Sequence, residues 1–323
     1  MKSRLIDSYN RKIDYLRISV TDRCNLRCIY CMPSDVVDWV SHSEILSYEE
    51  IIQLVKYATE IGICKIRITG GEPLVRKDVV SLIRKLSEID NISDLSMTTN
   101  GTLLSKYAKE LKHAGLKRVN ISLDTLNKKK YWKITGGGKI EDVWGGIQEA
   151  QNVGLQPIKI NVVIMRGVND DEIVDFAKLT MNNPYYIRFI EFMPISRTWD
   201  ERRFVPISEV KNRIKGLFSI DSVPGSGPAH YYKLNGAIGT LGFISPVSVN
   251  FCSNCNRLRL TSDGKLRPCL LSDTEVDVKP VLRNDPTPEG IKDLFVTAIK
   301  NKQLRYNNLP LVGHNLSMSQ IGG

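Results

Sequence analysis

The stretch Thr21-Asp22-Arg23-Cys24-Asn25-Leu26-Arg27-Cys28-Ile29-Tyr30-Cys31 brings three cysteines onto one short loop. Three thiolates with this spacing can hold a cubane iron–sulfur cluster and leave one iron without a protein ligand, whereas clusters that only transfer electrons usually take four thiolates. An iron with a free position can bind a small molecule, as the open position of catalytic zinc does. The spacing is unlike common zinc spacings, but a zinc site or a disulfide-forming loop is an alternative interpretation.

A second set of cysteines lies near the other end of the chain. Cys252, Cys255 and Cys269 form it, and the two sets together hold six of the seven cysteines. Six cysteines could form three disulfides, but that requires an oxidising compartment, and the first twenty residues contain no apolar signal segment. We therefore interpret the thiols as reduced and metal-bound in a cytoplasmic protein. For the second set, zinc completed by His230 or His314 is an alternative.

The composition is that of an ordinary globular protein. The chain has 323 residues, of which 42% are hydrophobic and 25% charged, enough for a full barrel or two domains. No apolar run approaches the roughly 20 residues that span a bilayer, so we expect no membrane partner. A net charge of +10 is compatible with nucleic acid, an anionic surface or a polyphosphate substrate. We interpret Lys128-Lys129-Lys130 as a solvated turn.

Residues 15 to 193 alternate β-rich runs with amphipathic runs. We predict strands at residues 15–20, 65–69, 94–99, 117–124, 157–165 and 185–193. Between them, apolar residues recur at helical spacing, and Ser47 with Glu50 forms a capping box before the first helix. Repeated strand-then-helix units predict parallel strands with right-handed crossovers. A complete eight-unit barrel needs about 250 residues, so we expect an α/β fold: an incomplete six-stranded barrel over residues 1–194, closed by a C-terminal extension over residues 195–323.

Polar motifs fall where the predicted strands end, which is where ligands meet parallel strands. They are Gly70-Gly71-Glu72-Pro73, Thr98-Thr99-Asn100-Gly101, Ser122 with Asp124, Lys159 with Asn161, and Glu191-Phe192-Met193-Pro194. In the extension, an extended run would point Arg257 and Arg259 to one face and Leu258 to the other. Two guanidinium groups beside a metal cluster suit an anionic ligand. The shared placement of these motifs predicts one site.

The cysteine loop with Tyr30, followed by the Gly-Gly-Glu-Pro motif, resembles the radical S-adenosylmethionine superfamily. That resemblance implies that the open iron is chelated by S-adenosylmethionine, and that an electron from the reduced cluster cleaves it to methionine and a 5′-deoxyadenosyl radical. Residues 17–25, 66–73, 98–101 and 252–259, with the terminal Gly322-Gly323, further resemble the molybdenum cofactor biosynthesis protein A (MoaA) family, whose members are GTP 3′,8-cyclases. This resemblance spans nearly the whole chain.

The resemblance implies a role for each matching residue. Cys24, Cys28 and Cys31 would hold the [4Fe–4S] cluster that binds S-adenosylmethionine, and Cys252, Cys255 and Cys269 a second [4Fe–4S] cluster whose open iron binds the guanine of GTP. S-adenosylmethionine would be lined by Tyr30, Gly71, Ser122 and Met193. GTP would be contacted by Arg17, Arg67, Thr98, Lys159, Arg257, Leu258 and Arg259, with Lys65 and Arg188 as weaker candidates for its triphosphate. Arg17 would lie near the ribose or the α-phosphate, and Gly322 and Gly323 would reach into the barrel and support catalysis.

The implied reaction removes the ribose 3′ hydrogen, joins C3′ to C8 of guanine and gives 3′,8-cyclo-7,8-dihydroguanosine triphosphate. Its implied partners are GTP, an external electron donor and a downstream cyclic pyranopterin monophosphate synthase, with no nucleic acid, in a monomer or homodimer. Two alternatives stay open. Another radical enzyme with an auxiliary cluster, such as a peptide maturase, usually carries more C-terminal cysteines. A zinc-holding nucleic-acid-binding module is disfavoured by an aromatic content of only 7% and by the absence of a recognised motif.

Overall fold

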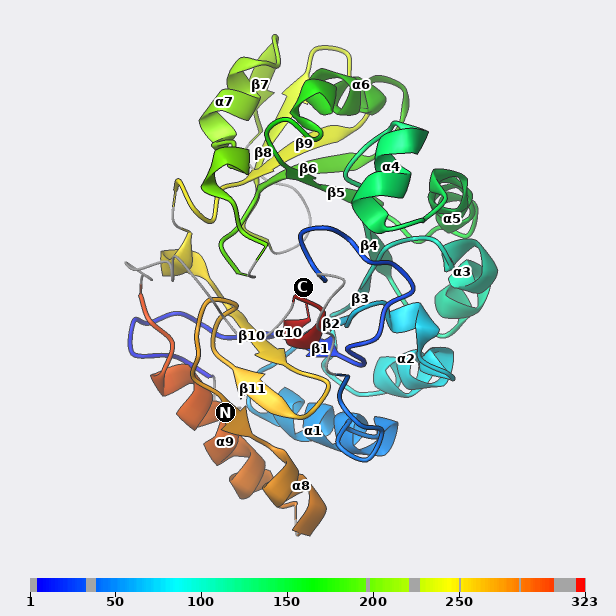
Figure 1. Ribbon diagram of the computed structural model, residues 1–323. Helices are drawn as coiled ribbons and strands as arrows, with labels where there is room; N and C mark the ends of the chain where they lie inside the picture. The colour runs from blue at the N-terminus through cyan, green and yellow to red at the C-terminus, as the bar shows by residue number, and fades with distance from the viewer. Residues whose placement is uncertain are drawn as a thin grey trace.

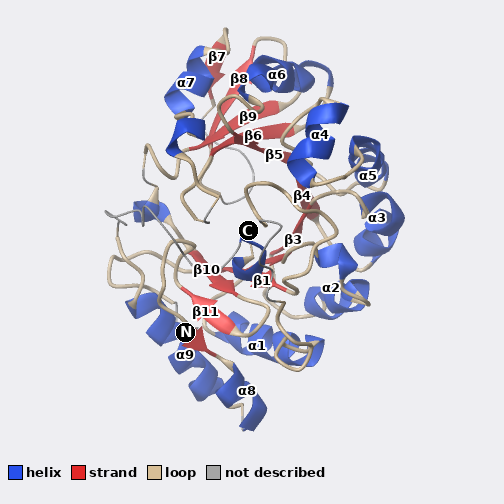
Figure 2. Ribbon diagram, in the orientation of Figure 1, coloured by secondary structure: helices blue, strands red, loops and turns tan. Residues whose placement is uncertain are grey.

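One curved sheet wraps around the centre of the molecule, with helices along its outer side (Figure 1 and Figure 2). The computed structural model describes residues 5–32, 39–195, 198–220, 227–249, 251–284, 286–304 and 318–322. His314 and Gly323 lie outside these residues. The sheet has twelve strands in the order β12-β11-β10-β1-β2-β3-β4-β5-β6-β9-β8-β7. No helix in the described part of the chain is long and apolar enough to cross a membrane.

The strands are β1 (Tyr15–Ser19), β2 (Lys65–Thr69), β3 (Asp94–Thr99), β4 (Arg118–Ser122), β5 (Lys159–Ile164), β6 (Tyr186–Glu191), β7 (Leu217–Ser219), β8 (His230–Leu234), β9 (Thr240–Ile244), β10 (Arg257–Leu260), β11 (Lys265–Arg267) and β12 (Val276–Asp277). The α-helices are α1 (Tyr48–Glu60), α2 (Val79–Ser87), α3 (Leu104–His113), α4 (Lys128–Thr135), α5 (Ile140–Asn152), α6 (Ile173–Asn182), α7 (Ile207–Asn212), α8 (Lys279–Asn284), α9 (Pro288–Lys300) and α10 (Met318–Ile321). Short 3-10 turns lie at η1 (Pro73–Val75), η2 (Asp170–Glu172), η3 (Glu201–Arg203) and η4 (Cys252–Asn254).

The six predicted strands are confirmed as β1 to β6, and each pairs with the next in parallel. The capping box at the start of α1 is also confirmed, because the Ser47 side chain accepts from the Glu50 N–H and the Glu50 carboxylate from the Ser47 N–H. Strands of the C-terminal extension lie on both sides of this parallel core: β10 pairs with β1 and β9 with β6, both in parallel. This α/β architecture is that of a partial barrel with a C-terminal extension built onto its edges.

The interpretation of Lys128, Lys129 and Lys130 as a turn is wrong. They form the first turn of α4, where the Asn127 side chain accepts hydrogen bonds from the N–H groups of Lys129 and Lys130. An N-cap of this kind satisfies donors that a helix start would otherwise leave free. The three adjacent charged residues suggested a solvated turn, although they begin an amphipathic helix.

The two faces of the parallel sheet differ in chemistry. Successive side chains of a strand point to opposite faces, so the alternation of each strand separates an aliphatic set from a polar set. The aliphatic set packs under the helices in one continuous core; it includes Leu16, Ile18, Ile66, Ile68, Met97, Val119, Ile121, Ile160, Val162, Ile187 and Phe189. The polar set faces the inside; it includes Arg17, Arg67, Ser96, Arg118, Asn120, Lys159, Asn161 and Arg188. Barrel interiors are usually filled by branched apolar residues, so this interior is built for a polar ligand.

Candidate functional site

A cavity of about 330 Å³ opens on the inner face, at the carboxyl ends of the strands, and both cysteine sets line it. Besides the six cysteines, its walls contain most of the predicted ligand-binding residues: Arg17, Tyr30, Arg67, Gly71, Thr98, Ser122, Arg188, Met193, Arg257 and Arg259. These ten residues come from six strands or the loops that follow them. The structure therefore brings together side chains that are up to about 240 residues apart in the chain.

The first cysteine loop is seated on the Gly-Gly motif that follows β2. The Gly71 N–H donates to the Thr21 carbonyl at 2.7 Å and the Glu72 N–H to the Arg23 carbonyl at 2.8 Å. A Cβ on Gly71 would lie 2.3 Å from the Arg23 oxygen, and one on Gly70 2.5 Å from the Thr21 oxygen. Only glycine permits so close an approach of two backbones. The Gly-Gly pair is therefore the bed of the cysteine loop rather than an ordinary turn.

Glu72 joins this bed to the loop after β3. It is fully buried, and its carboxylate accepts from the Leu74 N–H at 3.0 Å, the Thr99 hydroxyl at 2.8 Å and the Asn100 N–H at 2.7 Å. The Asn100 amide in turn donates to Asn25 at 2.9 Å and lies 3.7 Å from the Cys24 sulfur. Both motifs are visible in the sequence, but the positioning role of Glu72 is not.

Asp124 fixes the other side of the loop. The Tyr30 hydroxyl donates to its Oδ2 at 2.6 Å, and the Val163 N–H donates to Oδ1 at 2.8 Å. Burial raises the pKa of Asp124 to about 6, although both hydrogen bonds favour its charged form. The Tyr30 ring is thus held at the cavity wall by a strand-end carboxyl.

The thiols of the first set are partly buried. Burial raises the pKa values of Cys24, Cys28 and Cys31, for Cys31 to about 12. The Leu26 N–H donates to the Cys24 sulfur at 3.3 Å. Free thiols of this kind stay protonated until iron binds, and N–H donors to sulfur are contacts that tune bound clusters.

The second set is held by two buried cations from distant parts of the chain. Lys302 donates to the Arg257 carbonyl at 2.9 Å, to the Pro268 carbonyl at 2.8 Å and to the Cys255 sulfur at 3.5 Å. Arg11 donates to the Cys252 carbonyl at 2.6 Å and to the Lys302 carbonyl at 3.1 Å. Sequence reasoning missed both residues, because nothing local to Arg11 or Lys302 indicates contact with the cysteines.

These cations reverse the electrostatics of the second set. Burial alone would raise the pKa of Cys255, but Arg257 and Lys302 lower it to about 6. The Leu271 N–H lies 3.5 Å from the Cys269 sulfur. Nearby cations favour the thiolate form of Cys255, and the thiolate is the form of cysteine that binds metal.

Five arginines line the cavity, and its acidic lining residues are Asp124 and Glu191. Burial, followed by the neighbouring Arg259 and Arg67, lowers the pKa of Arg17. Burial also lowers the pKa values of Arg188 and Arg259, each to about 10. Burying several like charges is unfavourable unless an anion offsets them. The cavity is therefore suited to a polyanionic ligand.

Three predicted residues do not line the cavity. Lys65 forms an ion pair with Asp14 at 3.0 Å. Lys159 lies almost fully buried with its ammonium 5.5 Å from the centre of the Tyr186 ring, where burial, followed by Arg188, lowers its pKa to about 7. Leu258 is fully buried in the apolar core, because the alternation along β10 turns it away from Arg257 and Arg259. A ligand contact from Leu258 could come only from its backbone.

Helix α10 lies near the centre of the molecule in Figure 1. The Gly322 carbonyl accepts from the Arg259 guanidinium at 2.5 Å. Gly322 has φ of +77°, and a Cβ there would lie 3.0 Å from the Ser19 Cβ, so its conformation and its neighbours both favour glycine. Ile321 is fully buried against Ile195 and Leu271. The tail is therefore anchored at the mouth of the site as far as Gly322.

The chemistry of the two thiol sets fits iron–sulfur clusters. Zinc–sulfur bonds of about 2.3 Å would require its ligands to converge on one point. Among the described residues, no three Cys, His, Asp or Glu side chains converge tightly enough to hold a single ion, and His230 does not line the cavity. A cubane is wider, because each of its thiolates binds a different iron atom.

Comparison with known proteins agrees with this site. Residues 18–180 match the radical SAM superfamily, and residues 185–308 match the family described as Molybdenum Cofactor Synthesis C. A GTP 3′,8-cyclase of Thermodesulfovibrio yellowstonii is 52% identical over 98% of this chain and 99% of its own length. A GTP 3′,8-cyclase of Peptoclostridium acidaminophilum is 53% identical over 93% of both chains.

Solved structures show the same fold at much lower sequence identity. Streptococcus suis SuiB bound to S-adenosylmethionine has a TM-score of 0.60 and 17% identity, and the match covers 88% of this chain and 69% of SuiB. The structure titled native anSMEcpe with bound AdoMet has a TM-score of 0.55 and 15% identity, over 90% of this chain and 81% of that one. These two structures establish only the fold, whereas identity near 50% over almost the full length establishes the family. The chain belongs to the GTP 3′,8-cyclase family of the radical SAM superfamily.

Proposed function

We propose that this chain converts GTP to 3′,8-cyclo-7,8-dihydroguanosine 5′-triphosphate, the first step of molybdenum cofactor biosynthesis. The observation that carries the proposal is a single cavity lined by two sets of three cysteines and by five arginines. Relatives about 50% identical over nearly the whole chain are GTP 3′,8-cyclases, which supports the same substrate. The product would pass to a downstream cyclic pyranopterin monophosphate synthase.

Residues 1–194 would supply the S-adenosylmethionine side of the site. Cys24, Cys28 and Cys31 would hold the first [4Fe–4S] cluster, which with S-adenosylmethionine supplies a 5′-deoxyadenosyl radical. Glu72 and Asp124 hold the surrounding loops, and the Tyr30 ring covers the wall beside the thiols. Together with Gly71, Ser122 and Met193, these groups would orient the cofactor and keep water away from the radical.

Residues 195–323 would supply the substrate side. Cys252, Cys255 and Cys269 would hold a second [4Fe–4S] cluster, whose open iron would bind the guanine base. Arg17, Arg67 and Arg188 lie on the inner face of the sheet, where they can bind the triphosphate through charge-assisted hydrogen bonds. Arg257 and Arg259 lie beside the second cysteine set, so they can orient the nucleotide between its base and its phosphates. Thr98 adds a hydroxyl to the same wall.

The test is anaerobic reconstitution of the full chain with iron and sulfide, followed by incubation with a reductant, S-adenosylmethionine and GTP. We expect 5′-deoxyadenosine in amounts that depend on GTP, together with a cyclised nucleotide detected by mass spectrometry. Parallel reactions with ATP in place of GTP, and without any nucleotide, are the controls. Equal 5′-deoxyadenosine in all three reactions, with no cyclised nucleotide, would overturn the proposed function.

A further inference from the structure

Helix α4 is amphipathic, and its outer face is basic and aromatic. Tyr131, Ile134 and Thr135 are buried, while Lys129, Trp132 and Lys133 point to solvent. Trp132 is 60% exposed, which is unusual for so large an apolar ring. Residues three and four positions apart on a helix share a face, so Lys129 lies beside both Trp132 and Lys133.

The inner side of α4 packs directly on the first cysteine loop. The Arg27 N–H donates to the Thr135 carbonyl at 2.8 Å, and the Ile29 N–H donates to the Ile134 carbonyl at 2.9 Å. Tyr131 is buried on this inner side of α4. Its hydroxyl is buried without a hydrogen-bond partner among the described residues. Helix α4 therefore lies directly against the part of the loop that carries Cys28.

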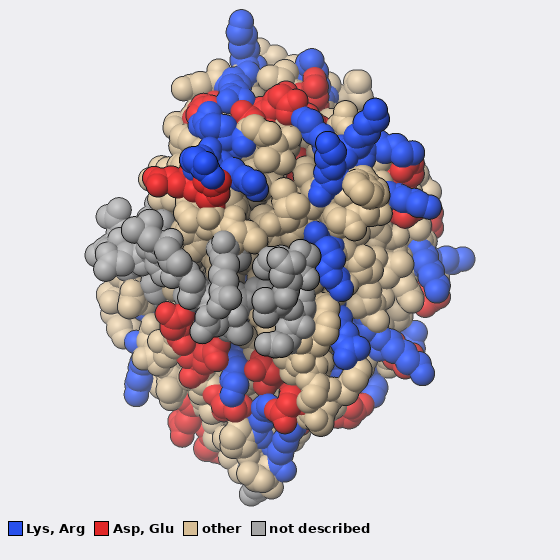
Figure 3. Space-filling model, in the orientation of Figure 1, with Lys and Arg blue, Asp and Glu red and all other residues tan. Residues whose placement is uncertain are grey.

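The basic and aromatic character continues from α4 onto the loop itself. The Arg27 guanidinium lies 5.3 Å from the centre of the Trp39 ring, and Trp39 is 36% exposed. We call Arg27, Trp39, Lys129, Trp132 and Lys133 the α4 patch. In the described part of the chain, neither Lys129 nor Lys133 forms an ion pair, although their neighbours Lys128 and Lys130 do. Figure 3 shows basic side chains gathered over α4 on this face.

We propose that the α4 patch is the docking surface for a small acidic protein that carries single electrons to the first cluster. This inference rests on the proposed function, which requires an external reductant. In the transfer, the carrier is oxidised by one electron and the cluster held by Cys24, Cys28 and Cys31 is reduced by one electron. No bond or proton is exchanged.

The patch has the properties that such a partner needs. Unpaired lysines attract an acidic protein from a distance and raise the rate of encounter by about 10- to 1,000-fold in favourable cases. Two exposed tryptophans provide contact area of the kind enriched at protein interfaces. Contacts of electron carriers are small and transient, which matches a patch of one helix and one loop. Its closeness to the cysteines makes the path of the electron short.

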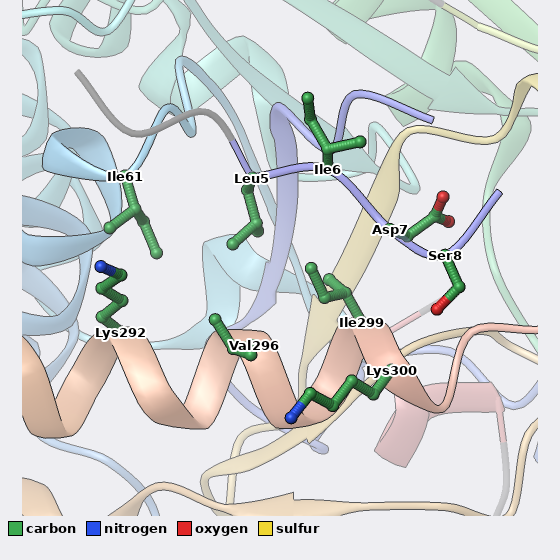
Figure 4. A pocket seen from close by; sticks show the side chains of 9 residues that line it. All are labelled: Leu5, Ile6, Asp7, Ser8, Ile61, Lys292, Val296, Ile299 and Lys300. Carbon is green, nitrogen blue, oxygen red and sulfur yellow. The ribbon is translucent and has the colours of Figure 1, made fainter. Parts of the chain in front are cut away.

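The experiment uses the full reconstituted chain and a reduced flavodoxin, a small acidic flavin protein, as the probe. The test variant is K129E with K133E, and W132A is a second variant that keeps the charge. The matched control is K292E with K300E. Both control lysines lie on α9, at the edge of a separate pocket of about 320 Å³ (Figure 4), and Figure 1 shows α9 on the opposite side of the molecule from α4. Each double variant lowers the net charge from +10 by four, to +6.

The first measurement is the second-order rate at which flavodoxin reduces the cluster, followed by stopped-flow absorbance at several salt concentrations. We expect K129E with K133E to be at least about tenfold slower than the unaltered chain at low salt, with a weaker salt dependence. The control pair should stay within about twofold. Titanium(III) citrate, a small reductant that needs no docking surface, should reduce all variants at similar rates, which also shows that the cluster is intact.

The second measurement is direct binding of oxidised flavodoxin by calorimetry, which does not depend on turnover. We expect W132A to weaken binding several-fold. Equal slowing in the α9 control, or unchanged rate and binding in both α4 variants, would overturn the proposal. If the patch governs flavodoxin reduction but no GTP-dependent product forms, the docking surface stands and the proposed function fails.

Discussion

The first cysteine set is held by backbone contacts, side-chain amides and the exposed Arg27, whereas the second is held by the buried cations Arg11 and Lys302. Around the first set, the close carboxyls are Glu72 and Asp124, and burial raises both of their pKa values. Around the second, Arg257 and Lys302 lower the pKa of Cys255 to about 6 against the effect of burial. Cysteine thiols therefore lie near carboxyl groups in the first set and near cations in the second, within one cavity.

This difference supports the assignment of the two sets to different ligands. S-adenosylmethionine carries a sulfonium cation, which is favoured near carboxyl groups and disfavoured near arginines. GTP carries a negatively charged triphosphate, which is favoured near arginines and disfavoured near carboxyl groups. We therefore expect S-adenosylmethionine beside the first set and the triphosphate beside the arginines, because exchanging the two ligands would bring like charges together.

The largest expected effect separates the sets by function. We expect C28S to abolish both 5′-deoxyadenosine and cyclised nucleotide, because the first cluster would lose a ligand. C255S should also abolish the cyclised nucleotide, but it should keep the first cluster and so about half of the iron. Iron analysis and electron paramagnetic resonance of both variants make the measurement. A C255S chain that loses all of its iron would show that the two sets fold as one unit.

The next effect concerns the tail, which touches both sets. The Ser319 N–H donates to Cys31, and the Gly322 carbonyl accepts from Arg259. We expect deletion of Gly322 and Gly323 to abolish cyclisation while both clusters remain, because Ile321 keeps α10 in its apolar seat. Product formation and iron content are measured together. A truncated chain with normal product formation would refute a catalytic role for the diglycine.

The backbone seat of the first set is tested at Gly71. In G71A the new Cβ would lie 2.3 Å from the Arg23 oxygen, so the cysteine loop must move. We expect a loss of about 2–4 kcal/mol in unfolding free energy and loss of the first cluster. The matched control is G145A in α5, where a Cβ meets nothing within 4 Å. It should be neutral or stabilising by up to about 1 kcal/mol. Chemical denaturation of both variants provides the comparison.

The cationic seat of the second set is tested at Lys302. K302M removes three contacts and leaves the Arg257 and Pro268 carbonyls without this donor. We expect unfolding free energy to fall by about 2–4 kcal/mol, since buried groups that lose their partner are costly. Iron should be lost from the second set before the first. Lys300 is exposed on the preceding helix, so K300M should change stability by less than about 0.5 kcal/mol. Equal effects of the two variants would remove Lys302 from its role.

The contrast also marks what sequence can reveal. The spacing of the first three cysteines, the Gly-Gly motif at a strand end and the six strands are local patterns that the sequence reveals, whereas the contact of Gly70 and Gly71 with the cysteine loop is not. Lys302 and Arg11 are not predictable in this way, because Arg11 meets the Lys302 carbonyl across 291 positions of the chain. Helix α4 was missed because its three adjacent lysines suggested a turn. Its inner side packs on the cysteine loop, and this contact is not visible in the local sequence pattern. The Leu258 side chain lies in the apolar core, as strand alternation predicts, so the ligand contact that the resemblance implies stays a prediction about its backbone.

The smallest expected effect is a pH dependence of stability that comes from a buried carboxyl beside the first set. Burial raises the pKa of Glu72 from 4.5 to about 7, so the folded chain holds this proton more tightly than the unfolded chain. Stability from this group is therefore complete below about pH 4.5 and is lost as pH rises through about 7. We expect a fall of about 1–3 kcal/mol over that window in the unaltered chain. E72Q cannot ionise, so this part of the slope should vanish even if its baseline stability is lower. E110Q, which removes an exposed carboxyl on α3, should keep the slope. Asp124, whose pKa burial raises to about 6, adds a part of the slope that E72Q should keep. An E72Q slope equal to that of the unaltered chain would mean that the buried Glu72 carboxyl beside the first set does not contribute to this pH dependence.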